Sequence, residues 1–339
     1  MDEREILSRL IQGPVSGDAL AREQGQTRAS VWKRMEALRQ AGVPIAAVPG
    51  RGYELEHPFD LLDHEAIIDS LQPHMRARLA SLEIAWTLDS TNSELLRRPP
   101  PADRTGLSTV LLAERQTGGR GRQGREWCSP LAAHLYLSLS RSFDGGLARL
   151  GGLSLVVGIA TAEALHALGY PMVRLKWPND LVVAGADGLR KLGGLLVEGG
   201  GEHGGPARAV IGLGLNVRMP QAYGDRIDQP WCDLASLGGV AAVPRNAIAA
   251  GLLAHWLPAL DDFDSHGLEP FLPRYAAVDA LAGRRVDIHP APGTGSDASA
   301  TGEALGVASD GALRVRMDDG TERSFHSGEA SIRRHGGNA

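Results

Sequence analysis

The most conspicuous shortage in this sequence is lysine. Its 339 residues include 35 lysines and arginines, of which only Lys33, Lys176 and Lys191 are lysines. An ammonium is a compact charge on a flexible stem, whereas a guanidinium is a planar fork, so the two groups are not interchangeable in a site. A lysine kept in so arginine-rich a chain therefore indicates a position that requires one. The alternative for Lys176 and Lys191 is that both are ordinary residues at strand ends.

Cysteines, targeting signals and long apolar runs are also scarce. Cys128 and Cys232 are far apart and form no Cys-x-x-Cys pattern, which excludes a disulfide framework. The 11 histidines show no metal-ligand spacing. The N-terminal Met-Asp-Glu-Arg-Glu lacks the basic and apolar segments of a signal peptide, and no apolar run approaches the ~20 residues that cross a bilayer. We therefore expect a cytoplasmic protein without membrane contact.

Charge and length narrow the remaining classes. The net charge of −5 excludes a wholly basic nucleic-acid binder, so any contact with DNA must be local. A hydrophobic fraction of 43% beside 22% charged residues is ordinary for a folded protein. A chain of 339 residues is long enough for two or three domains.

A segment rich in glycine and arginine stands between two apolar, strand-like runs, 109–114 and 135–139. Residues 116–127 read Gln-Thr-Gly-Gly-Arg-Gly-Arg-Gln-Gly-Arg-Glu-Trp. Such a segment bends freely, exposes its backbone N–H groups and can direct three permanent positive charges at one anion. We expect a mobile loop that closes over a phosphate-bearing ligand. On its own, the pattern also fits a solvated glycine hinge or an Arg-Gly tract that binds nucleic acid.

Further blocks flank this loop. Ser90-Thr91-Asn92 precedes it, and it is followed by Lys-Trp-Pro-Asn-Asp at 176–180, Lys-Leu-Gly-Gly-Leu-Leu-Val-Glu at 191–198 and Gly-Leu-Gly-Leu-Asn-Val at 212–217. In this order and spacing they resemble the blocks of bacterial biotin–protein ligases. The resemblance covers the region from about Ile84 to Tyr275 and extends in both directions to the whole chain. Glu126 departs from the family, which often has a basic residue there, and this puts retention of the reaction intermediate in doubt.

The resemblance implies a reaction. ATP activates biotin to biotinyl-5′-AMP, and the biotinyl group then passes to a specific lysine of the biotin carboxyl carrier protein of acetyl-CoA carboxylase. Biotin and ATP are the substrates, and Mg²⁺ is expected on the phosphates. Two alternatives stay open, a protein ligase of the related lipoate type and a catalytically inactive, ligand-sensing transcriptional regulator.

The matching residues take the roles that the resemblance implies. Lys191 is expected to bridge the biotin carboxylate and the α-phosphate, with Arg120 and Arg122 as further catalytic cations. Biotin is expected on Ser90, Thr91, Asn92, Gln116, Arg120, Gly121, Arg122 and Lys191. The nucleotide is expected on Gly119, Arg120, Arg122, Arg125, Trp127, Lys176, Asn179 and Asn216. Asp180 and Asn179 offer hard oxygens for Mg²⁺.

The first 56 residues read as a winged helix-turn-helix. An apolar stripe through Ile6 and Ile11 predicts a first helix, Ser16 and Thr27 can cap two more, and 45–55 fits a hairpin. Residues 27–53 carry five basic side chains against one glutamate, which is typical of a helix that lies in a major groove. Operator DNA is expected on Thr27, Arg28, Ser30, Lys33, Arg34 and Arg51. The alternative is a module that docks another protein.

This module resembles the DNA-binding domain of bifunctional ligases that repress their own biotin-synthesis genes. In those relatives the adenylate promotes a homodimer and raises operator affinity, which amounts to a free energy shared between two sites. We therefore expect biotin-responsive repression and a ligand-promoted homodimer here.

The rest of the chain completes an α+β multidomain protein. We expect a linker at 57–82 and then a catalytic domain at 83–276, in which a mixed sheet with packed helices is implied to be class II synthetase-like. Apolar runs predict helices at 148–167 and 245–260, and strands at 173–176, 181–183, 192–197 and 209–215. Short strands separated by turn signals at 280–335 predict a small SH3-like β-barrel, with a flexible loop at 290–299.

Overall fold

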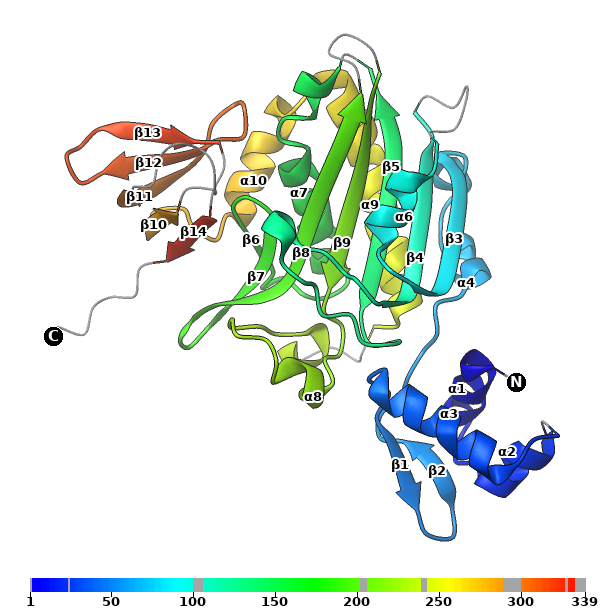
Figure 1. Cartoon of the computed structure of the whole chain (residues 1–339). Helices are drawn as coiled ribbons and strands as arrows, with labels where there is room; N and C mark the ends of the chain where they lie inside the picture. Colours follow the sequence, from blue (N-terminus) through cyan, green and yellow to red (C-terminus); the bar gives the residue numbers. More distant parts are fainter. Residues whose placement is uncertain are drawn as a thin grey trace, which may run out of the picture.

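The computed structural model describes residues 2–23, 25–99, 106–144, 146–201, 206–238, 243–289, 300–326 and 329–332. Within these ranges the chain forms an N-terminal helical module, a central sheet with packed helices and a C-terminal sheet (Figure 1). This is the α+β multidomain architecture that the sequence predicts.

The N-terminal module is a winged helix-turn-helix. Its elements are α1 (Glu3–Ile11), α2 (Gly17–Glu23), α3 (Arg28–Gln40) and the antiparallel hairpin of β1 (Ile45–Val48) and β2 (Gly52–Leu55). Both expected caps are present, since Ser16 Oγ accepts from Ala19 N at 3.1 Å and Thr27 Oγ1 accepts from Ser30 N at 3.2 Å. Ile11 is exposed where α1 ends, whereas the core is formed by residues that include Ile6, Leu7, Leu10, Val31, Met35 and Leu38.

The central unit is built on a mixed sheet whose order, in the described ranges, is β3-β4-β5-β9-β8-β7-β6. The pair β3–β4 is parallel and the other neighbouring pairs are antiparallel. The strands are β3 (Leu79–Leu88), β4 (Ser108–Gln116), β5 (Leu135–Phe143), β6 (Arg174–Lys176), β7 (Asp180–Gly185), β8 (Gly188–Gly201) and β9 (Ala207–Leu215). Because β8 begins before the run expected at 192–197, Lys191 lies within a paired strand.

Helices cover both faces of this sheet (Figure 1). The long helices α7 (Leu153–Ala167) and α9 (Arg245–His266) pack on one face with α10 (Leu272–Val278), and α6 (Thr91–Arg97) lies on the other. The helix expected from residue 148 begins later, after a 3₁₀ turn at Leu147–Leu150, because Gly152 takes a left-handed φ of 81° that interrupts it. Shorter elements are η1 (Arg122–Gly124), α8 (Gln221–Gly224), η3 (Leu234–Leu237) and η4 (Glu269–Phe271).

One apolar stretch is longer than any that was expected from the sequence. Leu147–Ala167 is long and apolar enough, by length and composition, to cross a bilayer, although no run of that kind was expected. In the structure most residues of α7 are buried, and α7 packs against α9. Such burial is what the core helix of a folded domain shows.

Residues 57–82, expected as a linker, pack closely on the central unit. They form α4 (His64–Asp69), α5 (Pro73–Arg76) and the start of β3, and they bury Leu62, Ile67 and Leu71 in the same apolar core as the sheet. A buried ion pair adds to this attachment. Arg245 donates to Glu114 Oε2 at 2.7 Å, and Glu114 Oε1 accepts from Leu62 N at 2.6 Å.

The C-terminal unit is a small antiparallel sheet with the order β13-β12-β11-β10-β14 in the described residues. Its strands are β10 (Arg285–His289), β11 (Ala300–Val307), β12 (Leu313–Met317), β13 (Glu322–Phe325) and β14 (Glu329–Ile332). The expected barrel strands are therefore present, and within the described ranges no ladder joins β13 to β14. The loop expected at 290–299 lies outside the described residues.

Candidate active site

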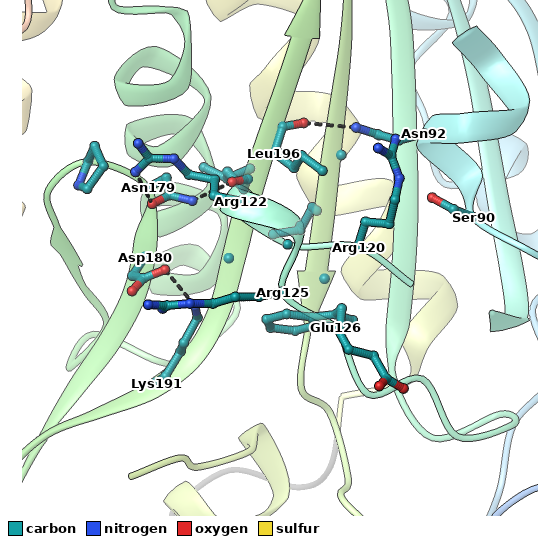
Figure 2. A pocket seen from close by; sticks show the side chains of 18 of the residues that line it. Ser90, Asn92, Arg120, Arg122, Arg125, Glu126, Asn179, Asp180, Lys191 and Leu196 are labelled. Carbon is teal, nitrogen blue, oxygen red and sulfur yellow. Dashed lines mark hydrogen bonds and ion pairs between the residues drawn. The ribbon is translucent and has the colours of Figure 1, made fainter. Parts of the chain in front are cut away.

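One cleft of the central unit collects most of the candidate residues. It lies between the start of α6, the glycine loop 116–127 and strands β7, β8 and β9 (Figure 2). The expected site residues that line it are Ser90, Thr91, Asn92, Gln116, Arg120, Gly121, Arg122, Arg125, Trp127, Lys176, Asn179, Asp180 and Lys191. Gly119 and Asn216 instead line an adjoining hollow, which shares Arg125, Trp127 and Lys191 with the cleft.

The start of α6 is fixed in the cleft wall by a hydrogen-bond network. Ser90 is the N-cap of this helix, and its Oγ accepts from a backbone N–H one turn on at 3.4 Å. Thr91 N and Oγ1 donate to Gln116 Oε1 at 2.9 and 3.2 Å. Ser138 Oγ donates to Asn92 Oδ1 at 2.6 Å and lies 2.7 Å from Thr91 Oγ1. Ser90 therefore caps α6 and lines the cleft at the same time.

Glu198 joins the loop to the same network. Its carboxylate accepts from Arg120 Nη2 at 3.1 and 2.8 Å and from Asn92 Nδ2 at 2.9 Å. Arg120 is 42% exposed at its side chain, so solvent screens this pair and its contribution to stability is small. The contact does place one loop guanidinium beside α6 (Figure 2).

Lys191 stands at the opposite side of the cleft. Its Nζ lies 2.8 Å from Asp180 Oδ1 on the neighbouring strand β7, and both side chains are about four-fifths buried, with exposures of 20% and 19%. The ammonium also lies 5.6 Å from the centre of the Trp127 ring. Partial burial with one carboxylate and one aromatic face gives a cation that is held in position and still borders the open space.

The Lys-Trp-Pro-Asn-Asp block supplies the wall between β6 and β7. Asn179 is fixed from two sides, because its Nδ2 donates to Leu195 O at 2.6 Å and its Oδ1 accepts from Arg122 Nη1 at 3.2 Å. Arg122 therefore reaches across the cleft from the loop (Figure 2). Trp177, which also lines the cleft, is held by a hydrogen bond from its Nε1 to Gly311 O in the C-terminal unit, at 3.1 Å.

Two glycines of β9 allow the walls to approach this closely. A Cβ at position 212 would collide with the amide of Asn92, and a Cβ at position 214 would collide with the Trp127 indole. Glycine at alternate positions of the strand thus gives the side chains of α6 and the loop direct access to the sheet backbone. The Gly-x-Gly spacing of this block is explained by packing as well as by any ligand.

The adjoining hollow lies between the loop and the segment 219–231. Trp231 belongs to a short stretch that runs beside β8, where Lys191 N donates to Pro230 O at 2.9 Å. Asn216 is buried, and its Nδ2 donates to Cys232 O at 3.1 Å, which holds this stretch in position. Trp127 and Lys191 thus separate two spaces that a two-part ligand could occupy together.

The metal prediction rests on few ligands. Among the described residues no group of three or more His, Cys, Asp or Glu side chains could hold a metal ion. Asp180 and Asn179 are adjacent and offer one carboxylate and one amide oxygen, which is compatible with a Mg²⁺ that is bound mainly through substrate phosphates. Both oxygens now face cations, namely Lys191 and Arg122.

Cys128, next to Trp127, is a potential nucleophile that its surroundings suppress. Burial, with the nearby Glu126 carboxylate, raises the pKa of its thiol. The thiolate is the reactive form of cysteine, so this environment favours the inert one.

The expected DNA-binding residues divide into two groups. Arg28, Lys33 and Arg51 are exposed, with Arg28 paired to Asp18 at 3.0 Å and Arg51 paired to Glu54 at 3.1 Å. The second group, Thr27, Ser30 and Arg34, has side chains that cap the helix, bond to a neighbouring residue or are partly buried. Thr27 caps α3, Ser30 Oγ donates to Gln26 Oε1 at 3.0 Å, and the Nη1 atom of Arg34 is buried without a hydrogen-bond partner in the described residues.

Comparison with known proteins agrees with all three units. The model of the biotin/lipoate A/B protein ligase family matches residues 88–216, an HTH domain matches 3–54, and a biotin protein ligase C-terminal domain matches 293–333. The bifunctional ligase/repressor BirA of Salmonella typhimurium is 38% identical over 332 residues, which are 97% of this chain and 96% of that protein. This chain belongs to the bifunctional ligase/repressor family.

Other relatives are consistent with that membership. BirA of Escherichia coli is 37% identical over 321 residues, covering 94% of this chain and 92% of that protein. Among solved structures, a biotin protein ligase from Aquifex aeolicus in complex with biotin and ATP superimposes with a TM-score of 0.59 at 25% identity, and it covers 76% of this chain and 100% of that one.

Several residues of the site were not predicted from the sequence. Glu198 ends the block at 191–198, yet no role was assigned to it, because its partner Arg120 lies 78 positions away. Ser138 sits in the middle of an apolar strand run and gave no signal. Tyr223 was also missed, because the partner of its hydroxyl, Gln40, lies 183 positions away.

Proposed function

We propose that this chain activates biotin with ATP and attaches it to the biotin carboxyl carrier protein of acetyl-CoA carboxylase. The observation that carries this proposal is the placement of Lys191. Its ammonium is held 2.8 Å from Asp180 at the boundary of two connected spaces, and the loop arginines line the same cleft. Family membership supports the same assignment, because the relatives are bifunctional ligase/repressors.

In the first half-reaction an oxygen of the biotin carboxylate attacks the α-phosphorus of ATP. The bond from that phosphorus to the bridging oxygen of the β-phosphate breaks, and pyrophosphate leaves as biotinyl-5′-adenylate forms. Two anions must approach each other, so the barrier falls when a fixed cation stands between them. Lys191 supplies this cation, and Asp180 keeps its side chain from rotating away.

The loop arginines neutralise the phosphates. Arg122 lies beside Asn179 at 3.2 Å and Arg120 lies beside Glu198, so they approach the cleft from its two sides. Arg125 and Lys176 complete the positive lining, and Trp127 offers its ring to the nucleotide. Asp180 and Asn179 would hold Mg²⁺, which supplies charge neutralisation on the phosphates when it is bound.

Biotin would lie at the start of α6. Its ureido ring needs a few hydrogen bonds in a largely apolar site, and Ser90, Thr91, Asn92 and Gln116 provide both donors and acceptors there. Gly121 brings loop backbone to the same place. In the second half-reaction a carrier lysine attacks the acyl carbon and AMP leaves. Until that lysine arrives, the loop must keep water from hydrolysing the adenylate.

The N-terminal module would make the same chain a biotin-responsive repressor of biotin-synthesis genes. The exposed Arg28, Lys33 and Arg51 on α3 and the wing would contact operator phosphates. A homodimer promoted by the adenylate would place two such modules on one operator. Activity of this kind belongs in the cytoplasm.

Mass spectrometry of a purified carrier domain tests the ligase proposal. The carrier is incubated with the protein, ATP, Mg²⁺ and biotin, and then with lipoate or octanoate in place of biotin. The proposal expects one biotinyl addition on one carrier lysine and no addition from the other acids. Modification by lipoate or octanoate alone would assign the chain to the sister chemistry, and no modification from any acid would leave a ligand-sensing regulator.

A further inference from the structure

The recognition helix α3 carries one large apolar side chain that the fold leaves uncovered. Val31, Met35 and Leu38 point into the module and are buried, as their spacing requires. Trp32 is 55% exposed and is the most exposed large hydrophobic side chain in the described ranges. The exposed part of this indole is available to a partner outside the module, and its surroundings decide which partner fits.

The surroundings of Trp32 identify the chemistry of that partner. Arg28, one helical turn earlier, and Lys33, the next residue, are both exposed. The acids nearby are already paired, because Glu36 accepts from Arg39 at 2.5 Å and Asp18 from Arg28 at 3.0 Å. A single aromatic side chain among cations suits a polyanion that also presents apolar groups, whereas a protein interface would place more apolar area around it.

The position along the helix specifies the contact further. Trp32 is the fifth residue of α3, and the N-terminal part of a recognition helix is the part that meets base edges in the major groove. Thymine is the base that displays a methyl group there, so it is the base that an apolar side chain can distinguish. Arg28 and Lys33 beside it would bind the phosphates that border the same groove.

We propose that Trp32 is a sequence-reading residue, whose indole packs on the 5-methyl group of a thymine in each half-site. The inference rests on the repressor part of the proposed function and adds to it a base preference and the residue that sets it. Lys33 serves as the matched comparison, since it is the exposed neighbour and would contact phosphate only.

Selection from a random duplex DNA library tests the proposal. The full-length protein is used with biotin, ATP and Mg²⁺, and each thymine of the selected duplex is then replaced by uracil, which lacks only the methyl group. We expect uracil at one thymine of each half-site to weaken wild-type binding about fourfold, the loss expected when one methyl group leaves an apolar contact. Trp32→Ala should bind the thymine and uracil duplexes equally well.

Lys33→Ala should behave differently. Its affinity should fall on every sequence, and the slope of log affinity against log salt should fall by about one, while the sensitivity to uracil persists. Equal carrier biotinylation by all three proteins would show that the variants are folded.

Three outcomes would overturn the inference. A wild-type uracil scan that finds no sensitive thymine needs no variant and is decisive by itself. A Trp32→Ala protein that keeps the wild-type uracil sensitivity, or that changes only its oligomeric state, assigns the indole to another contact. Failure of the wild type to select any DNA would remove the repressor proposal and this inference together, which distinguishes that case from the first two.

Discussion

The hydroxyl of Tyr223 donates a hydrogen bond to the carbonyl of Gln40, at 2.7 Å. Gln40 is the last residue of the recognition helix α3, and Tyr223 lines the hollow beside the cleft. A second contact lies alongside, where Leu131 N donates to Ala41 O at 2.8 Å just beyond the glycine loop. The end of α3 is therefore attached to two segments next to the hollow beside the cleft.

Removing this hydroxyl should weaken the coupling between ligand and DNA. In Tyr223→Phe we expect the increase in DNA affinity caused by biotin and ATP to shrink about two- to tenfold, the range for one hydrogen bond. Fluorescence anisotropy with a selected DNA duplex, with and without both substrates, measures that ratio. Tyr53→Phe is the matched control, because no hydrogen bond from its hydroxyl occurs in the described residues. An unchanged ratio in Tyr223→Phe would mean that the contact is only structural.

The glycine loop should retain the adenylate. Arg122→Gly removes the contact to Asn179, and Gly119→Ser places a Cβ 2.6 Å from Trp127 O and 2.7 Å from Ser129 Oγ, which forces the loop to shift. Both variants should release biotinyl-5′-adenylate and biotinylate bystander lysines, such as those of serum albumin, several-fold more than wild type does. Arg51→Gly in the wing is the control. Variants that still modify only the carrier would remove this role from the loop.

Asp180 should be needed both to hold the Lys191 ammonium in place and to bind Mg²⁺. In Asp180→Asn we expect adenylate formation to slow about 10- to 100-fold and the Mg²⁺ concentration for half-maximal rate to rise, because a carboxylate beside Lys191 is lost. Initial rates at a series of Mg²⁺ concentrations show both effects. Asp187→Asn, an exposed aspartate between β7 and β8, should leave both values unchanged. A normal Mg²⁺ requirement in Asp180→Asn would exclude Asp180 as a metal ligand.

His134 should make the central unit sensitive to acid. Burial lowers the pKa of this imidazole to about 3, below its ordinary value of 6.5, and its Nδ1 accepts from Val217 N at 3.1 Å. Because the unfolded chain takes up a proton near pH 6.5 and the folded chain does not, stability falls as the pH drops below that value, by about 1.4 kcal/mol per pH unit.

Urea unfolding of the wild type and of His134→Gln checks this effect. The wild type should lose stability between pH 6.5 and pH 5 more steeply than the variant, although the variant starts from a lower value at pH 7 because the site is buried. Parallel pH profiles for the two proteins would show that another group is responsible.

Much of the fold was predictable because its signals are local. Thr27 caps α3 through a residue three positions on, and the apolar spacing through Val31 and Leu38 defines the buried face. The start of α7 was misplaced because Leu147, Ala148 and Leu150 extend the apolar pattern, whereas Gly152 prevents a continuous helix. The attachment of 57–82 depends on burial against a distant sheet, which no local pattern encodes.

The candidate site divides in the same way. Residues inside the sequence blocks, such as Lys191 and Arg122, were predictable as a set, and the structure brings them to one cleft. Their partners were not, since Arg120 and Glu198 are 78 positions apart and Tyr223 and Gln40 are 183 apart. The hydrogen bond from the Asn216 amide to Cys232 O was likewise not predictable, because only the folded chain brings the two residues together.

The exchange of labelled pyrophosphate into ATP, with biotin as the acid, tests the central claim most directly. We predict biotin-dependent exchange by the wild type and by Lys33→Ala, and a loss of about 10²- to 10³-fold in Lys191→Ala, because the fixed cation between the two anions is gone. Exchange by Lys191→Ala at the wild-type rate, or wild-type exchange that does not require biotin, would contradict the account.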